Sequence, residues 1–165
     1  ISNTLNFKSK VTTKRDLSIG KWLKTKMQIS SDFTDEMFRA KSNLIGDKLQ
    51  KSIEGDFGWF NLVNKKVGIG QIEIYNGQEL AESRGREIIK ILSKLKAELR
   101  LDIIFLSIVD LGNAFNVFIT KDEIARSLLQ SIFGVNFYGN IAVKYGIIMR
   151  KEITPLLKIE LAKIL

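Results

Sequence analysis

Residues 101–109 (LDIIFLSIV) form an apolar run that is long enough for one β-strand and too short to span a membrane. Successive side chains of a strand point to opposite faces of its sheet, so a strand with apolar residues on both sides must be covered twice. This run therefore predicts an interior strand of a sheet that has helices packed against both faces.

Other segments repeat the strand pattern. Residues 65–75 (KKVGIGQIEIY) alternate in polarity, with Gly68 and Gly70 at positions where a neighbouring group is expected to approach closely. Strand patterns also occur over residues 113–120, 135–138 and 140–149. We therefore expect an α/β fold, namely a mixed sheet of about five strands with helices on both faces, preceded by a helical linker segment.

Helices are predicted between these strands. Residues 80–99 carry an apolar stripe at helical spacing, and Pro155 marks a position at which the last helix can begin. Thr120 and Glu123 have the spacing of a capping box at the start of another helix. Residues 48–60 are expected to form a short helical or irregular piece. The domain boundary is expected at residue 46, with a helical linker or tail of a preceding domain in 1–46 and a second domain in 47–165.

The composition excludes several kinds of chemistry. The 165 residues include no Cys and no His, which removes disulfides, thiolate zinc sites, imidazole ligands and the usual general base. No segment has the length of a membrane-spanning helix, and the start lacks a signal-peptide core, so we expect a cytoplasmic protein with no membrane partner. The chain begins at Ile1, and we expect a fragment of something longer or a processed product.

The net charge of +8 is unevenly distributed. Residues 1–30 hold seven basic side chains against the single acid Asp16, so the remainder of the chain is nearly balanced. A basic start is compatible with nucleic acid or an acidic surface, and equally with a solvated helix and linker. A single basic face over the whole protein is therefore not expected.

Two basic dipeptides are the strongest candidates for a binding site. Lys65-Lys66 begins one predicted strand, and Arg150-Lys151 follows another, so each pair can present cations at the rim of the sheet. Arg binds two oxygens of a phosphate in a fork, and Lys adds a point charge, although ordinary surface solubility explains such pairs as well. Asp110, at the end of the apolar strand, is either a functional carboxylate or a cap of the following turn.

Three segments, in this order and at this separation, resemble a known family. They are VNKKVGIGQIEIY (63–75), DIIFLSIVDLG (102–112) and YGIIMRKEITPLL (145–157), and DEMFRAKSNL (35–44) resembles the segment that joins the two domains of those enzymes. The family is the pyrophosphatase branch of the DHH phosphoesterase superfamily, which includes manganese-dependent family II inorganic pyrophosphatases, exopolyphosphatases and prune-like proteins. The resemblance is to the C-terminal, DHH-associated (type 2) domain.

The resemblance implies that two domains have different roles in the enzyme. The N-terminal DHH catalytic domain of the same polypeptide carries the metals, manganese or else magnesium or cobalt, and the C-terminal domain closes over it as a lid. The implied substrate-binding residues are Lys66, Arg150, Lys151 and Gln71, with Lys65 and Asp110 as secondary candidates. The resemblance implies no catalytic residue and no metal ligand on this chain, which is expected to be inactive alone.

Departures from the family pattern bear on the substrate. Met149 replaces a Ser, Val109 replaces a Thr, and Glu152 stands where a second Lys is usual, which adds a negative charge near a pocket for an anion. These differences argue against strict pyrophosphate specificity and leave a polyphosphatase-like or otherwise divergent phosphoesterase open, so the substrate can be pyrophosphate, polyphosphate or another phosphoester.

The function expected from the sequence is thus the phosphate-gripping domain of a metal-dependent phosphoanhydride hydrolase. The alternative is a non-catalytic phosphoanion or nucleic-acid binding module, although nucleic acid is not the expected partner. A homodimer stays open.

Overall fold

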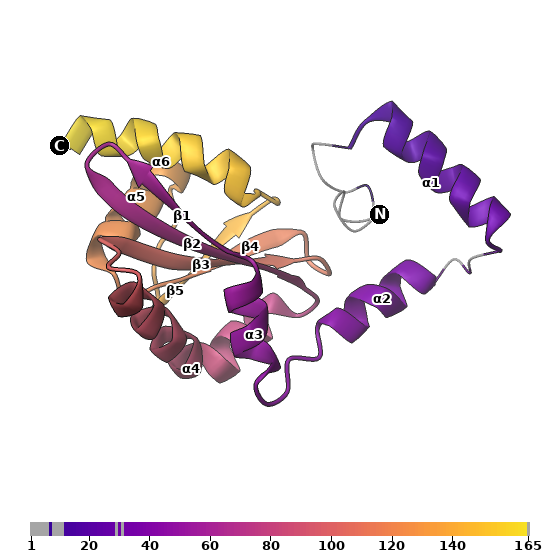
Figure 1. The fold of residues 1–165 in the computed structure, drawn as a ribbon, viewed down its shortest axis with the longest axis horizontal. Helices are drawn as coiled ribbons and strands as arrows, with labels where there is room; N and C mark the ends of the chain where they lie inside the picture. The colour runs from indigo at the N-terminus through magenta and orange to yellow at the C-terminus, as the bar shows by residue number, and fades with distance from the viewer. Residues whose placement is uncertain (1–6, 8–11, 29, 31, 165) are drawn as a thin grey trace. The chain divides into compact units, whose positions relative to one another are not determined.

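A computed structural model describes residues 7, 12–28, 30 and 32–164, and it divides the chain into two compact units between Asn43 and Leu44. The first unit contains the helices α1 (Lys14–Lys26) and α2 (Phe33–Lys41), and the second contains the sheet with the other helices (Figure 1). The α1 helix begins with a capping box in which Thr13 and Asp16 bond each other's backbone.

The second unit is built on one five-stranded mixed sheet in the order β1-β2-β3-β4-β5. β2 and β3 are parallel, and the other neighbouring pairs are antiparallel. Every residue of β3 is buried, which confirms the interior strand predicted from the apolar run. The strands are β1 (Phe57–Leu62), β2 (Lys65–Ile74), β3 (Ile103–Asp110), β4 (Phe115–Ile119) and β5 (Ile141–Tyr145).

Helices cover both faces of this sheet, as the apolar run predicted. One face carries α3 (Lys48–Gly55) and α4 (Gly77–Glu98), and the other carries α5 (Glu123–Phe133) and α6 (Arg150–Ile164) (Figure 1). Alternation along β2 decides which residues belong to which face. Ile72 and Ile74 join the apolar cluster of α3 and α4, whereas Val67 and Ile69 join the cluster of α5 and α6.

Gly68 confirms the expected close approach at the glycines of β2. A Cβ at this position would lie 2.5 Å from Cδ1 of Leu101 and 2.6 Å from Cζ of Phe57, which is closer than carbon atoms pack. The absence of a side chain therefore lets the Phe57 ring of β1 and the Leu101 side chain cover β2 directly.

Two expectations about the strands are wrong. The segment 48–60, expected to be helical or irregular, contains α3 and also the start of β1. Residues 135–138 are not a strand; they supply only an isolated bridge, in which Tyr138 and Ile141 exchange two backbone hydrogen bonds around a turn. Gly139 occupies that turn with φ of 59°, a conformation that interrupts a strand.

The predicted capping box at Thr120 is also wrong. Asp122 caps α5 instead, because its side chain accepts the backbone N–H of Ala125 at 3.0 Å. The Thr120 hydroxyl donates to the Ile104 carbonyl at 2.7 Å and accepts the backbone N–H of Asp122. Thr120 thus joins the end of β4 to β3 instead of capping α5.

The last helix begins before the position that Pro155 suggested. α6 starts at Arg150, and Pro155 lies inside its second turn. Glu152 provides the start signal, because its Oε2 accepts the backbone N–H of Met149 at 3.0 Å. This earlier start places Arg150 and Lys151 in the first turn of the helix.

Candidate functional site

Buried Asn116 of β4 fixes the loop that delivers Arg150 to the sheet. Its side-chain amide donates to the Ile148 carbonyl at 2.7 Å, and its Oδ1 accepts the Ile148 backbone N–H at 2.9 Å. Because Asn116 is fully buried, both ends of its amide are held in one orientation. The first turn of α6 is therefore anchored to the centre of the sheet two residues before Arg150.

The Arg150 guanidinium is held against the start of β1. Nη2 lies 2.5 Å from Asp56 Oδ1, and Nη1 donates to the Asp56 carbonyl at 2.7 Å and to the Ile69 carbonyl at 3.3 Å. A Cβ at Gly58 would lie 3.5 Å from Cζ of Arg150, so the guanidinium rests directly on the backbone of β1. The arginine is thus oriented by the protein before any ligand binds, while a quarter of its side chain stays exposed.

Gln71 joins the same arrangement from the middle of β2. Its Oε1 accepts the backbone N–H of Arg150 at 2.7 Å, which satisfies one of the free donors at the start of α6. Its own backbone N–H donates to the Asp56 carbonyl at 3.0 Å. Gln71 is buried, and through this bond it positions Arg150.

A groove of about 380 Å³ lies beside this cluster, between β1 and α6. Phe60 and Leu62 form its apolar wall on β1. The wall on α6 consists of Thr154 and Pro155 with three cationic side chains, those of Arg150, Lys151 and Lys158. We call this hollow the α6 groove.

The α6 groove is electropositive. Lys151 and Lys158 are exposed, and neither side chain has a hydrogen-bond or ion-pair partner among the residues that the structure describes. Glu152, which the sequence placed near an anion pocket, does not line the groove because its carboxylate turns back to Met149. The dipole of α6, whose positive end lies at Arg150, adds to the positive potential. The groove can thus hold an anion with several oxygens.

The structure does not bring Lys66 to this groove. Lys66 lies at the start of β2 on the face of α3 and α4, since it alternates with Val67, and its Nζ donates to the Leu99 carbonyl at 2.7 Å. The Nζ also lies 4.2 Å from the ring centroid of Trp59. Lys65 has the opposite orientation and pairs in register with Leu62, a wall residue of the groove.

Asp110 is fully buried at the end of β3. Its Oδ1 accepts the backbone N–H groups of Gly112 and Asn113, each at 3.0 Å, which confirms the turn cap that the sequence allowed. Its Oδ2 accepts the backbone N–H of Gly77 at 2.7 Å and so fixes the start of α4. These bonds tie Asp110 to the sheet and α4, away from the α6 groove.

Two residues of the site were not predicted from the sequence. Lys158 had a visible signal, because it follows Lys151 by seven residues and so returns to the same side of a helix. Asp56 had none, because it precedes Arg150 by 94 residues and only the folded sheet joins them.

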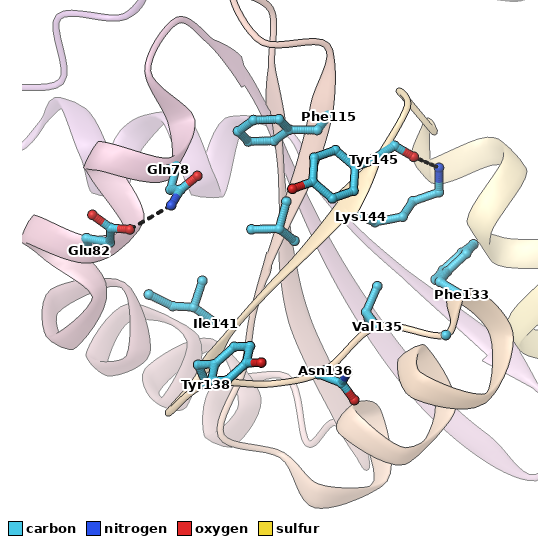
Figure 2. A pocket seen from close by; sticks show the side chains of 12 residues that line it. Gln78, Glu82, Phe115, Phe133, Val135, Asn136, Tyr138, Ile141, Lys144 and Tyr145 are labelled. Atoms are coloured by element: carbon cyan, nitrogen blue, oxygen red, sulfur yellow. Dashed lines mark hydrogen bonds between the residues drawn. The ribbon is translucent and has the colours of Figure 1, made fainter.

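A larger hollow of about 830 Å³ opens beside the β5 edge strand (Figure 2). Its walls are mostly apolar or aromatic, including Phe115 and the exposed ring of Tyr145. Its lysine, Lys144, donates to the carbonyls of Tyr145 and Gly146, and Glu82 adds a carboxylate. This hollow therefore lacks the cation set that distinguishes the α6 groove.

Within the described ranges, no group of three or more carboxylates is arranged to hold a metal ion. The same ranges contain no helix that is long and apolar enough to cross a membrane.

Known proteins resemble this chain over most of its length. It is 34% identical over 155 residues to a manganese-dependent inorganic pyrophosphatase of Methanocaldococcus jannaschii, covering 92% of this chain and 49% of that protein. It is 29% identical over 160 residues to the manganese-dependent inorganic pyrophosphatase of Bacillus subtilis, covering 95% of this chain and 51% of that protein. The chain therefore spans about half the length of the curated relatives it matches.

A solved structure supports the same relationship. The fold superposes with a TM-score of 0.79 on a Methanococcus jannaschii protein described as a family II inorganic pyrophosphatase, at 31% identity, covering 96% of this chain and 52% of that one. The DHHA2 domain family matches residues 35–159. The chain thus belongs to the DHHA2 domain family and is homologous to the C-terminal region of manganese-dependent family II inorganic pyrophosphatases.

Proposed function

We propose that this chain is the phosphate-binding half of a metal-dependent phosphoanhydride hydrolase, with the α6 groove as its anion site. The proposal is supported by the family membership and, above all, by three cations on one wall of a groove that no carboxylate of the described residues lines. Pyrophosphate and longer phosphate chains are the ligands that suit a site of this charge.

The cations of the groove have distinct roles in this proposal. Arg150, oriented by Asp56, presents its remaining N–H groups to phosphate oxygens in a fixed direction. Lys151 is exposed and has no ion-pair partner among the described residues, so it adds a point charge for the phosphate oxygens. Transfer of a phosphoryl group to water needs this charge neutralised and the group held in line, and pre-oriented cations supply both.

The other half of the enzyme lies outside this chain in the proposal. Relatives of about twice the length are described as manganese-dependent, and we infer that a DHH catalytic domain of the same polypeptide holds the metal ions and the attacking water. Bound metal would activate that water and share the phosphate charge. The present chain would bind the anion weakly alone and turn nothing over.

Calorimetric titration of the chain with pyrophosphate at low salt tests this proposal. Lys151→Gln should raise the Kd about tenfold, because a charge-assisted hydrogen bond contributes about 1.5–3 kcal/mol. Lys94→Gln is the matched control, since Lys94 is an exposed lysine of α4 outside the groove. Absence of pyrophosphate binding, or an equal effect of both substitutions, would reject the α6 groove as the anion site.

A second candidate is nucleic-acid binding through α1. This helix carries five basic residues and exposes 59% of Trp22, a ring on which a base can stack. A steep loss of oligonucleotide affinity with salt, together with its loss in Trp22→Ala, would favour this candidate. Pyrophosphate affinity that depends on Lys151 favours the hydrolase.

A further inference from the structure

We propose that the α6 groove selects phosphate chains longer than pyrophosphate, and that Lys158 is the residue that provides the selection. This inference rests on the proposed function and adds a substrate class to it. Its basis is the row of cations that continues along α6 beyond the two that resemble the family motif.

The spacing of the lysines sets the length of the ligand. Lys151 and Lys158 are seven residues apart on α6 and both line the groove, so they extend from one side of the helix. At a rise of 1.5 Å per residue they are separated by about 10.5 Å along the helix axis. Pyrophosphate, with two phosphorus atoms joined by one oxygen, reaches Arg150 and Lys151 but leaves Lys158 without a partner.

The opposite, apolar wall of the groove confines a long anion to the side of α6. Phe60 and Leu62 alternate with Asn61 on β1, so both present apolar surface to the groove and neither competes for phosphate. A chain anion held on the α6 side therefore runs along the helix from Arg150 toward Lys158. Lys65 lies opposite Leu62 in the β1–β2 register but does not line the groove, so the cations of this path are the three on α6.

The carboxylates that could neutralise this row are already engaged. Asp56 binds Arg150, Glu152 accepts the backbone of Met149, and Glu160 accepts hydrogen bonds from Ser131 and Lys163. Lys151 and Lys158 have no bonded partner within the described part of the chain. Two unneutralised lysines on one side of a helix repel each other weakly, and an anion that bridges them removes that repulsion.

Competition calorimetry with pyrophosphate, tripolyphosphate and a longer linear polyphosphate tests the inference at constant ionic strength. The unmodified chain should bind the longer polyphosphate at least about tenfold more tightly than pyrophosphate, as one added charge-assisted contact predicts. Lys158→Gln should reduce the ratio of the polyphosphate affinity to the pyrophosphate affinity to about one, and Lys158→Arg should keep the ratio of the unmodified chain.

Lys163→Gln is the matched control, because Lys163 lies on the same helix and carries the same charge but does not line the groove. Equal losses in the two glutamine variants would mean general electrostatic attraction and would overturn the inference, while Lys151-dependent pyrophosphate binding would leave the proposed function standing. Loss of all phosphate binding would reject both. A single-stranded oligonucleotide of equal charge that competes as well as polyphosphate would overturn the selection of phosphate chains.

Discussion

The side-chain oxygen of Gln71 accepts the backbone N–H of Arg150 at 2.7 Å, across 79 residues of sequence. The bond joins the middle of a buried strand to the first turn of the last helix, and it places the arginine beside Asp56. The geometry of the proposed anion site therefore depends on a buried residue of β2.

Substitution of Gln71 by Leu should destabilise the domain by about 1–3 kcal/mol, because the Arg150 N–H and the neighbouring polar groups lose a buried partner. Urea unfolding measures this loss. Gln50→Leu is the control, since Gln50 bonds only an exposed carboxylate one turn along α3, and it should change the stability little. Equal effects of the two substitutions would contradict the structural role of Gln71.

Asp56→Asn should tighten pyrophosphate binding by about two- to fivefold. The amide keeps an oxygen that accepts from Arg150, so the guanidinium stays oriented while one negative charge beside the groove disappears. Calorimetry at two salt concentrations measures the change, which should shrink as salt rises. Weaker binding by the Asn variant would show that the charge of Asp56 is needed to position Arg150.

Lys66→Met should leave the pyrophosphate Kd within about twofold, since the side chain lies on the other face of the sheet and is bonded to the Leu99 carbonyl. The measurement is the same titration used for Lys151→Gln, which serves as the positive control. A loss of affinity as large as that of Lys151→Gln would restore Lys66 to the binding site expected from the family resemblance.

Asp110→Ala should destabilise the protein by about 3 kcal/mol, because the buried N–H group of Gly77 and the partly buried N–H groups of Gly112 and Asn113 lose their common acceptor. The unfolding midpoint in urea measures this effect. The pyrophosphate Kd of the folded fraction should be unchanged. A selective loss of binding without loss of stability would instead assign Asp110 to the substrate.

Glu160 should make the contact between α5 and α6 sensitive to acid. A hydrogen bond from Lys163, and a further one from Ser131, hold the pKa of Glu160 below its ordinary value of 4.5. The ionised form thus stabilises the folded state above pH 4.5, and this contribution is lost as the pH falls through the lower folded pKa. Thermal melts from pH 3 to pH 7 should show a higher Tm for the unmodified protein than for Glu160→Gln only at the upper end of this pH range. Glu98→Gln, in an exposed pair, is the control, and a constant difference across the range would contradict the linkage.

The sequence predicted the architecture because its strongest signals are local. The apolar run of β3 and the alternation of β2 depend on neighbours two residues apart, and they specified a covered mixed sheet. The strand β1 was missed because Gly58 is its second residue and Gly55 ends the helix just before it, and both interrupt the pattern. The cap of α5 was misplaced because Thr120 has a stronger partner, the Ile104 carbonyl, on another strand.

The candidate site was predicted only in part. Arg150 and Lys151 were found as adjacent cations at a strand end, and both line the α6 groove. Lys66 and Gln71 were expected to act together, yet they are an odd number of residues apart on one strand. Their side chains therefore point to opposite faces, a signal that the sequence already contained.

By itself, the sequence determined the fold class, the family resemblance and the pair Arg150-Lys151, because each depends on a short motif or a regular period. Only the tertiary structure decided that Asp56 and Gln71 orient that arginine, that Asp110 is a buried cap, and that Lys158 extends the row of cations. The physical reason is that a binding site is made by contacts between distant segments, and their register is set by the packing of the whole sheet.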